Sequence, residues 1–110
     1  MRAKQFILSE SPRTNFWFSP GFDSDIKNYI LTNQFPNACL ACQDEVYRWA
    51  KKLAKSGIES EIHHGFYYPN GDYDSPEGHS WLEIEGSIFD PTAGQFDDYG
   101  EGEYETHEID

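Results

Sequence analysis

The chain has 110 residues, and its 20 acidic side chains outnumber the 8 lysines and arginines, which gives a formal net charge of −12. Such an acidic surface repels phosphate groups, so we expect neither nucleic-acid binding nor adhesion to anionic membranes, and a basic partner protein would suit it. The two cysteines are too few for a disulfide framework, and no apolar run approaches the roughly 20 residues of a membrane span. We therefore expect a cytoplasmic protein with reduced thiols.

The first predicted elements are a loop and a short helix. Residues 9–22 are rich in proline and serine and are predicted to be a loop. A helix should follow, capped by Asp23 or Ser24. It should end before Pro36, because the residue before a proline disfavours the helical conformation.

The clearest periodicity predicts a helix over residues 37–56. Its apolar face consists of Cys42, Val46, Trp49, Ala50 and Leu53. Asn37 can cap the N-terminus and Gly57 can end the helix. Acidic residues lie early and lysines late, which suits the helix dipole.

Strands are predicted in the second half of the chain. Alternation predicts a strand over 58–67, and turn-forming residues fill 68–78. Two short strands, 79–85 and 87–91, should follow as a hairpin with its turn near Gly86.

The chain is therefore predicted to be a single α+β domain over residues 1–96. The last fourteen residues, from Asp97, include seven acids and two glycines. We expect them to form an acidic flexible tail over 97–110.

Three residue types with complementary chemistry stand at the ends of these elements. Cys42 lies in the first part of its helix, where the dipole and free N–H groups favour a thiolate. His79 opens a strand and can take and return a proton. Asp90 ends the next strand and can hold the histidine ring in one tautomer and orientation.

The predicted hairpin tests whether His79 and Asp90 can meet. With a two-residue turn at Glu85-Gly86, Trp81 lies opposite Asp90 and His79 lies diagonally from it on the same face. A four-residue turn keeps this arrangement, whereas a three-residue turn puts the two side chains on opposite faces. The even register also gathers the apolar side chains of both strands on the other face.

The same residues resemble a known family. The helix that begins Cys42-Gln43-Asp44 and leads into Ser56–Ser60 is similar to the nucleophile helix of transglutaminase-like proteins. The stretch His79–Ile84 resembles that family's His-Ala-Trp-x-Glu-x strand, and Phe89–Ala93 resembles its Asp-Pro-Thr ending. The three pieces occur in the family's order and cover residues 38–96.

This resemblance implies a papain-like fold in which a nucleophile helix packs on a small antiparallel sheet. It implies Cys42 as nucleophile, His79 as base and acid, and Asp90 as the residue that orients the histidine. Gln34 is the candidate for a side-chain oxyanion donor, and Trp81 and Tyr67 are candidates for the walls of a substrate pocket. No metal or organic cofactor is required.

Other interpretations of the cysteines remain open. Cys39 is the rival nucleophile, since a cap at Asn37 would put it closer to the start of the helix. The Cys39–Cys42 pair is also a Cys-x-x-Cys motif, which occurs in redox and zinc sites. A zinc site would take two further ligands from His63, His64 and His79, and a reversible disulfide would silence the thiol.

The sequence as a whole predicts a thiol-dependent acyl-transfer enzyme that acts on an amide or ester in a protein or peptide substrate. Hydrolysis by a peptidase or deamidase and transglutamination use the same residues, and the small domain favours hydrolysis. The alternative is a non-catalytic acidic binding module of the same fold. A protein that mimics DNA and inhibits a DNA-binding partner is a variant of this alternative.

Overall fold

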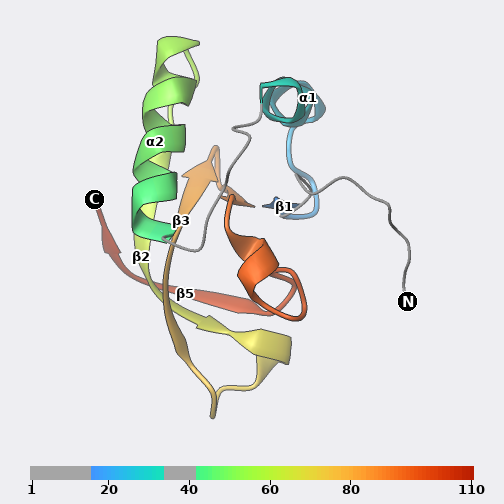
Figure 1. Cartoon of the computed structure of the whole chain (residues 1–110), viewed down its shortest axis with the longest axis vertical. Helices are drawn as coiled ribbons and strands as arrows, with labels where there is room; N and C mark the ends of the chain where they lie inside the picture. Colours follow the sequence, from blue (N-terminus) through green and yellow to red (C-terminus); the bar gives the residue numbers. More distant parts are fainter. Residues whose placement is uncertain (1–15, 34–41) are drawn as a thin grey trace.

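The computed structural model describes residues 16–33 and 42–110. Within them the chain forms a small α+β domain with two α-helices and one five-stranded antiparallel sheet (Figure 1). The elements in chain order are β1 (Trp17–Phe18), α1 (Ser24–Thr32), α2 (Cys42–Lys55), β2 (Glu61–Tyr68), β3 (Glu77–Ile84), β4 (Ser87–Asp90) and β5 (Glu103–Ile109). None of the helices in this part of the chain is both long and apolar enough to cross a bilayer.

Both predicted helices are present. Asp23 caps α1, since its Oδ1 accepts hydrogen bonds from the N–H groups of Asp25 (2.9 Å) and Ile26 (3.0 Å). The described part of α2 begins at Cys42, while the expected cap at Asn37 lies outside the described residues. Gly57 follows α2 with φ +81°, a conformation that a glycine adopts without strain.

The sheet has the strand order β1-β4-β3-β2-β5. In the β3–β4 hairpin Ile84 lies opposite Ser87, which leaves Glu85 and Gly86 as a two-residue turn. Both turn residues have positive φ, 53° and 82°, as in a type I′ turn. The predicted turn near Gly86 is therefore confirmed, and it has the two-residue form.

Two segments differ from the sequence prediction. Trp17 and Phe18 form β1 on the edge of β4, although 9–22 was expected to be a loop. Residues 97–110 were expected to be a flexible tail, but Glu103–Ile109 form β5, which pairs with β2. The tail prediction is wrong here because most acidic side chains of this segment point to solvent from an edge strand, whose backbone pairing does not depend on them.

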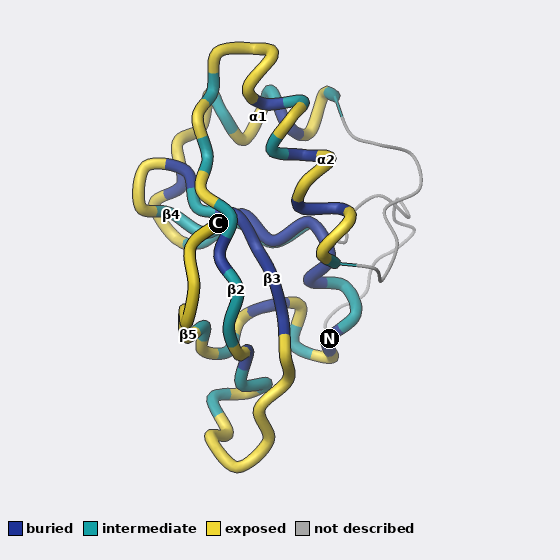
Figure 2. The backbone as a smooth tube through the Cα atoms, turned by 90° about the vertical axis from the view of Figure 1, so that its left-hand side faces the viewer, coloured by how far each residue is buried: buried dark blue, intermediate teal, exposed yellow. Residues whose placement is uncertain are grey.

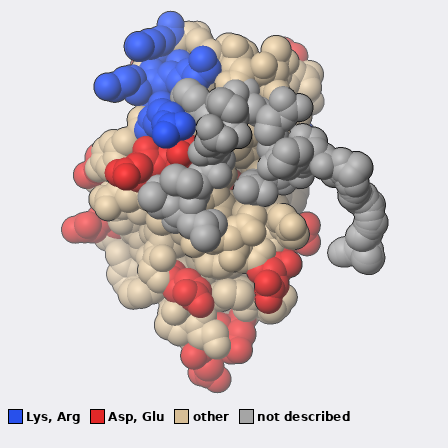
Figure 3. Space-filling model, viewed as in Figure 1, with Lys and Arg blue, Asp and Glu red and all other residues tan. Residues whose placement is uncertain are grey.

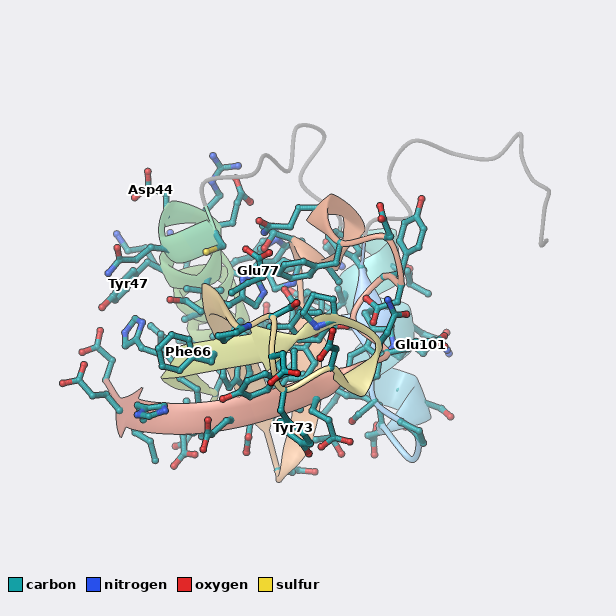
Figure 4. The ribbon with its side chains drawn as sticks, turned by 90° about the horizontal axis from the view of Figure 1, so that it is seen from below. Asp44, Tyr47, Phe66, Tyr73, Glu77 and Glu101 are labelled. Atoms are coloured by element: carbon teal, nitrogen blue, oxygen red, sulfur yellow. The ribbon has the colours of Figure 1, made fainter. Side chains whose placement is uncertain are left out.

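The two faces of β3 contact two different apolar layers. On one face α1, α2 and the sheet enclose the core, which consists of Phe22, Ile30, Val46, Trp49, Leu53, Leu82, Ile84 and Phe89. Figure 4 shows Asp44 on the opposite side of α2, pointing away from the sheet, while Tyr47 projects sideways and its ring lies 6.5 Å from that of His64. Because successive side chains of a strand alternate, Trp81 faces the other way from Leu82.

The second layer is aromatic and surrounds Trp81. Its ring lies 4.9 Å from the ring of Tyr104, and the Tyr104 ring lies 4.7 Å from that of Tyr67. Tyr67 also packs on Phe96 at 4.3 Å. Figure 2 shows the resulting burial, with most of β3 dark blue between its neighbours. One face of the sheet is thus closed by helices and the other by aromatic side chains from β2, β3, β5 and the β4–β5 connection.

Candidate active site

The centre of the candidate site is a buried hydrogen bond between β3 and β4. His79 Nε2 lies 2.7 Å from Asp90 Oδ2, and both side chains are fully buried. Asp90 is the last residue of β4, and the register that pairs Leu82 with Phe89 brings Trp81 level with it. His79 and Asp90 thus lie on one face of the sheet, as the even register predicted.

The Asp90 carboxylate is held at both oxygens. Its Oδ1 accepts hydrogen bonds from the backbone N–H (3.1 Å) and the hydroxyl (3.4 Å) of Thr92. Its Oδ2 accepts a hydrogen bond from the hydroxyl of Tyr104 at 2.6 Å, besides the one from His79. An ionised carboxylate offers only acceptors, and every neighbour here is a donor. The carboxylate is therefore fixed in orientation.

Cys42 brings a thiol to the same place from the first residue of α2. It is half-buried and free. Burial would raise the pKa of this thiol, but interaction with His79 and with the backbone N–H of Ser80 outweighs burial, so that the pKa is lowered from its ordinary value. Cys42 is also the first described residue of α2, and a thiol near the N-terminus of a helix is favoured as the thiolate.

The pKa of the His79 imidazole is shifted in the opposite direction to that of the thiol. Burial would lower the pKa of His79, but the hydrogen bond to Asp90, the nearby thiol of Cys42 and the negative charges of both groups raise the pKa to about 9. With Nε2 bonded to Asp90, Nδ1 is buried and makes no regular hydrogen bond to another described residue. Nδ1 is therefore the ring nitrogen left for the thiol. A thiolate and an imidazolium stabilise each other in this arrangement.

The two residues expected to form walls of a substrate pocket lie inside the aromatic layer. Trp81 and Tyr67 are both fully buried. The rings of Trp81 and His79 are 6.0 Å apart and nearly parallel, and the Tyr67 hydroxyl donates to Asp98 at 2.6 Å. Both rings pack beside the histidine and present no surface to solvent.

Two other candidate residues lie outside the described part of the chain. Gln34, the possible oxyanion donor, and Cys39, the rival nucleophile, fall within residues 34–41. Their expected roles therefore stay predictions.

Two hollows of the surface lie away from these residues. A cavity of about 590 Å³ is lined by residues of α1, the α2–β2 connection and the β3–β4 hairpin, four of them acidic: Glu59, Glu61, Glu83 and Glu85. A smaller hollow of about 240 Å³ lies on α2 between its basic side chains, Arg48, Lys51, Lys52 and Lys55. Figure 3 shows these basic groups gathered over α2 and acidic groups spread over the lower part of the same face.

One group of the described residues has ligands that suit a metal ion. Single ligand atoms of Glu61, His63 and Glu83 lie within 4.8 Å of one another. His63 is also satisfied by protein groups alone, since Nδ1 lies 2.7 Å from the Thr106 hydroxyl and Nε2 lies 3.2 Å from Glu61. These hydrogen bonds account for the cluster as it stands.

No protein-family model, curated protein or solved structure matches this chain. The strongest indication of its chemistry is therefore the geometry of Cys42, His79 and Asp90.

Sequence reasoning missed Tyr104, which contacts Asp90 from β5. A signal was present in residues 103–109, where acids alternate with residues that favour strands, such as Tyr104 and Thr106. The high density of acids concealed this alternation.

Proposed function

We propose that this protein is a thiol-dependent acyl-transfer enzyme with Cys42 as nucleophile, His79 as general acid and base, and Asp90 as the residue that orients the imidazole. The observation that carries the proposal is the buried 2.7 Å contact of His79 with Asp90 beside a thiol whose pKa is lowered by the same histidine. Nucleophile, base and orienting group are the parts that covalent acyl transfer requires.

The reaction begins with attack of the Cys42 thiolate on the carbonyl carbon of an amide or ester. The carbonyl electron pair moves to oxygen, and the backbone N–H of Cys42 is the donor that we propose to stabilise this oxyanion. As the intermediate collapses, the imidazolium of His79 gives its proton to the leaving amine or alcohol, and a thioester remains on Cys42. A water molecule then attacks the thioester while His79 takes its proton, and the acid product leaves as the thiolate and imidazolium are restored.

Fold and resemblance support this proposal. A helix that starts at the nucleophile and packs on an antiparallel sheet, with the histidine and aspartate on neighbouring strands, is what the transglutaminase-like resemblance implies. We extend the proposal to a papain-like fold and to a protein or peptide substrate. Hydrolysis is favoured over transfer to an amine because a small domain leaves a half-buried thiol within reach of water. A reactive free thiol suits the reducing cytoplasm.

The thiolate can be tested without knowing the substrate. Iodoacetamide alkylates thiolates, so we expect Cys42 to be alkylated well below about pH 7, whereas an ordinary thiol titrates near about pH 8.5. The His79→Ala variant should move the alkylation profile to the ordinary range. Cys39→Ser is the control and should keep the low-pH reactivity, which Cys42→Ser should abolish. A wild-type Cys42 that titrates at the ordinary pH would refute the proposal.

Acylation itself can be observed by mass spectrometry of the intact protein after exposure to an activated ester such as p-nitrophenyl acetate. One acetyl group should appear on Cys42 and disappear with time as water resolves the thioester. Cys42→Ser should remain unmodified under the same conditions. Acetylation that persists in Cys42→Ser would show reaction elsewhere and contradict the assignment.

A basic partner is the second candidate, favoured by the cavity of about 590 Å³ lined by four glutamates. A lysine- or arginine-rich peptide has the chemistry to fill it. The Cys42→Ala variant distinguishes the two functions, because a binding module keeps its affinity for such a peptide while the acyl-transfer enzyme loses its acetylation.

A further inference from the structure

We propose that Tyr104 is a positioning residue of this site, which holds the Asp90 carboxylate so that the ring of His79 faces the thiol. This inference rests on the proposed function and adds to it a fourth residue, supplied by the last strand of the chain. Its basis is that Tyr104 Oη donates to the same oxygen, Asp90 Oδ2, that accepts from His79 Nε2, at 2.6 Å and 2.7 Å.

The two hydrogen bonds to Oδ2 and those to Oδ1 together fix the plane of the carboxylate. Thr92 holds Oδ1, so rotation of the carboxylate about its Cβ–Cγ bond is opposed at both ends. Such rotation would turn the acceptor away from His79 Nε2, and the ring would then be free to tilt. A tilt of the ring would move Nδ1 relative to the sulfur of Cys42. Tyr104 therefore acts on the thiol through Asp90 and His79.

Tyr104 is itself held firmly enough to have this effect. Its ring stacks on Trp17 at 5.7 Å and lies 4.7 Å from Tyr67 and 4.9 Å from Trp81. Burial, followed by the negative charge of Asp90, raises the pKa of Tyr104 above its ordinary value, so that its hydroxyl keeps the proton that it donates.

The fold explains why this residue comes from β5. Tyr104 lies opposite Tyr67 in the β2–β5 pairing, and the register shifts between His64 and Gly65. A Cβ on Gly65 would lie 1.9 Å from the carbonyl oxygen of Glu105, so the glycine permits β5 to approach β2 this closely. The close pairing sets Tyr104 within reach of Asp90.

The chain offers a matched control for this proposal. Tyr67 is also buried, belongs to the same aromatic layer and donates from its hydroxyl to an aspartate, Asp98, at 2.6 Å. The hydroxyl of Tyr67 makes no hydrogen bond to His79, Asp90 or Cys42. Tyr67→Phe and Tyr104→Phe thus remove the same group from the same layer, and only Tyr104→Phe removes a hydrogen bond to a residue of the proposed site.

The experiment measures alkylation of Cys42 by iodoacetamide against pH in the full chain. Tyr104→Phe should lower the rate at about pH 6 roughly tenfold, by analogy with the lower end of the losses that follow removal of an outer hydrogen bond orienting a metal-bound histidine. Tyr67→Phe should keep the alkylation rate within about twofold of the wild-type rate. Urea should unfold both variants more readily than the wild type, since each loses a buried hydrogen bond. In an Asp90→Asn background, Tyr104→Phe should have no further effect, since its partner charge is already removed.

Each result separates the two proposals. Slow alkylation of the wild-type protein at low pH would overturn the proposed function and this inference with it. A reactive wild type with an equally reactive Tyr104→Phe variant would overturn only the role of Tyr104. If Tyr67→Phe and Tyr104→Phe lower the alkylation rate equally, the cause is a general loosening of the aromatic layer, and the role of Tyr104 is overturned. The same follows if Tyr104→Phe keeps its full effect on the rate in the Asp90→Asn background.

A second measurement on the unmutated protein covers the case in which Tyr104→Phe does not fold. Because both donors meet at one oxygen, the Nε2–H proton of His79 and the Oη–H proton of Tyr104 should exchange slowly and show a nuclear Overhauser effect to each other by NMR. Two slowly exchanging protons without such an effect would overturn the inference.

Discussion

Replacing Asp90 by asparagine keeps the size of the side chain and removes its charge, so this variant tests the electrostatics of the site. The pKa of His79 rises from 6.5 to about 9 because hydrogen bonds and charges of Asp90 and Cys42 outweigh burial. One pKa unit is about 1.4 kcal/mol, so the protonated ring is favoured by about 3 kcal/mol. Without the charge of Asp90 only Cys42 opposes burial, and we expect the pKa of His79 to fall.

The shift also makes the folding stability depend on pH. A pKa raised in the folded state means that the stabilisation is fully present below about pH 6.5 and is lost as the pH rises through about 9. The pKa of Cys42 is lowered, so its contribution has the opposite sign: it is present above the ordinary thiol value and is lost as the pH falls. The two contributions oppose each other, and Cys42→Ala isolates that of His79.

The assay is urea unfolding of Cys42→Ala and of Cys42→Ala/Asp90→Asn at about pH 6 and about pH 9.5. Cys42→Ala should lose between about 1 and about 3 kcal/mol more than the double variant over this range. The difference between the two variants reaches about 3 kcal/mol if Asp90 alone raises the pKa of His79. It is smaller if Cys42 is responsible for part of that rise. Titrations of other groups common to both variants cancel in the difference. Equal losses in the two variants would refute the electrostatic reasoning, whatever the alkylation experiments give.

Other predictions concern the elements that build the site. Gly65→Ala should detach β5, because the added Cβ would lie 1.9 Å from the carbonyl oxygen of Glu105. Gly78→Ala should be tolerated, because a Cβ at that position would have no atom within 4 Å. Thermal unfolding of both variants tests this prediction. Phe89→Ala should lower the free energy of unfolding by about 3 to 5 kcal/mol in urea titrations, because its ring is fully buried in the core. Asp23→Ala removes the acceptor for two N–H groups of α1 and should lower the free energy of unfolding by about 1 kcal/mol. An unchanged free energy of unfolding would count against the cap.

Local patterns in the sequence were enough to predict that His79 and Asp90 meet. The periodicity of α2 predicted which side of the helix faces the sheet, and Gly86 predicted the place of the hairpin turn. Once the turn has two residues, parity alone puts His79 and Asp90 on the same face. These steps need no knowledge of distant parts of the chain.

Contacts between distant segments could not be predicted in this way. The two residues of β1 are too few to show alternation, and their pairing with β4 joins positions about seventy residues apart, for example Trp17 and Asp90. The place of β5 depends on a register shift at Gly65 that no local pattern specifies. The role of Tyr104 depends on that pairing, so the residue was missed although the strand that carries it shows alternation.

The strand order leaves β5 at one end of the sheet, with one row of backbone N–H and C=O groups not paired within it. Such an edge can template pairing with another molecule, and proteins often prevent this with charge. Glu103, Glu105 and Glu108 are exposed along β5. Two copies that approached edge to edge would bring these carboxylates together, so mutual repulsion protects the strand from aggregation.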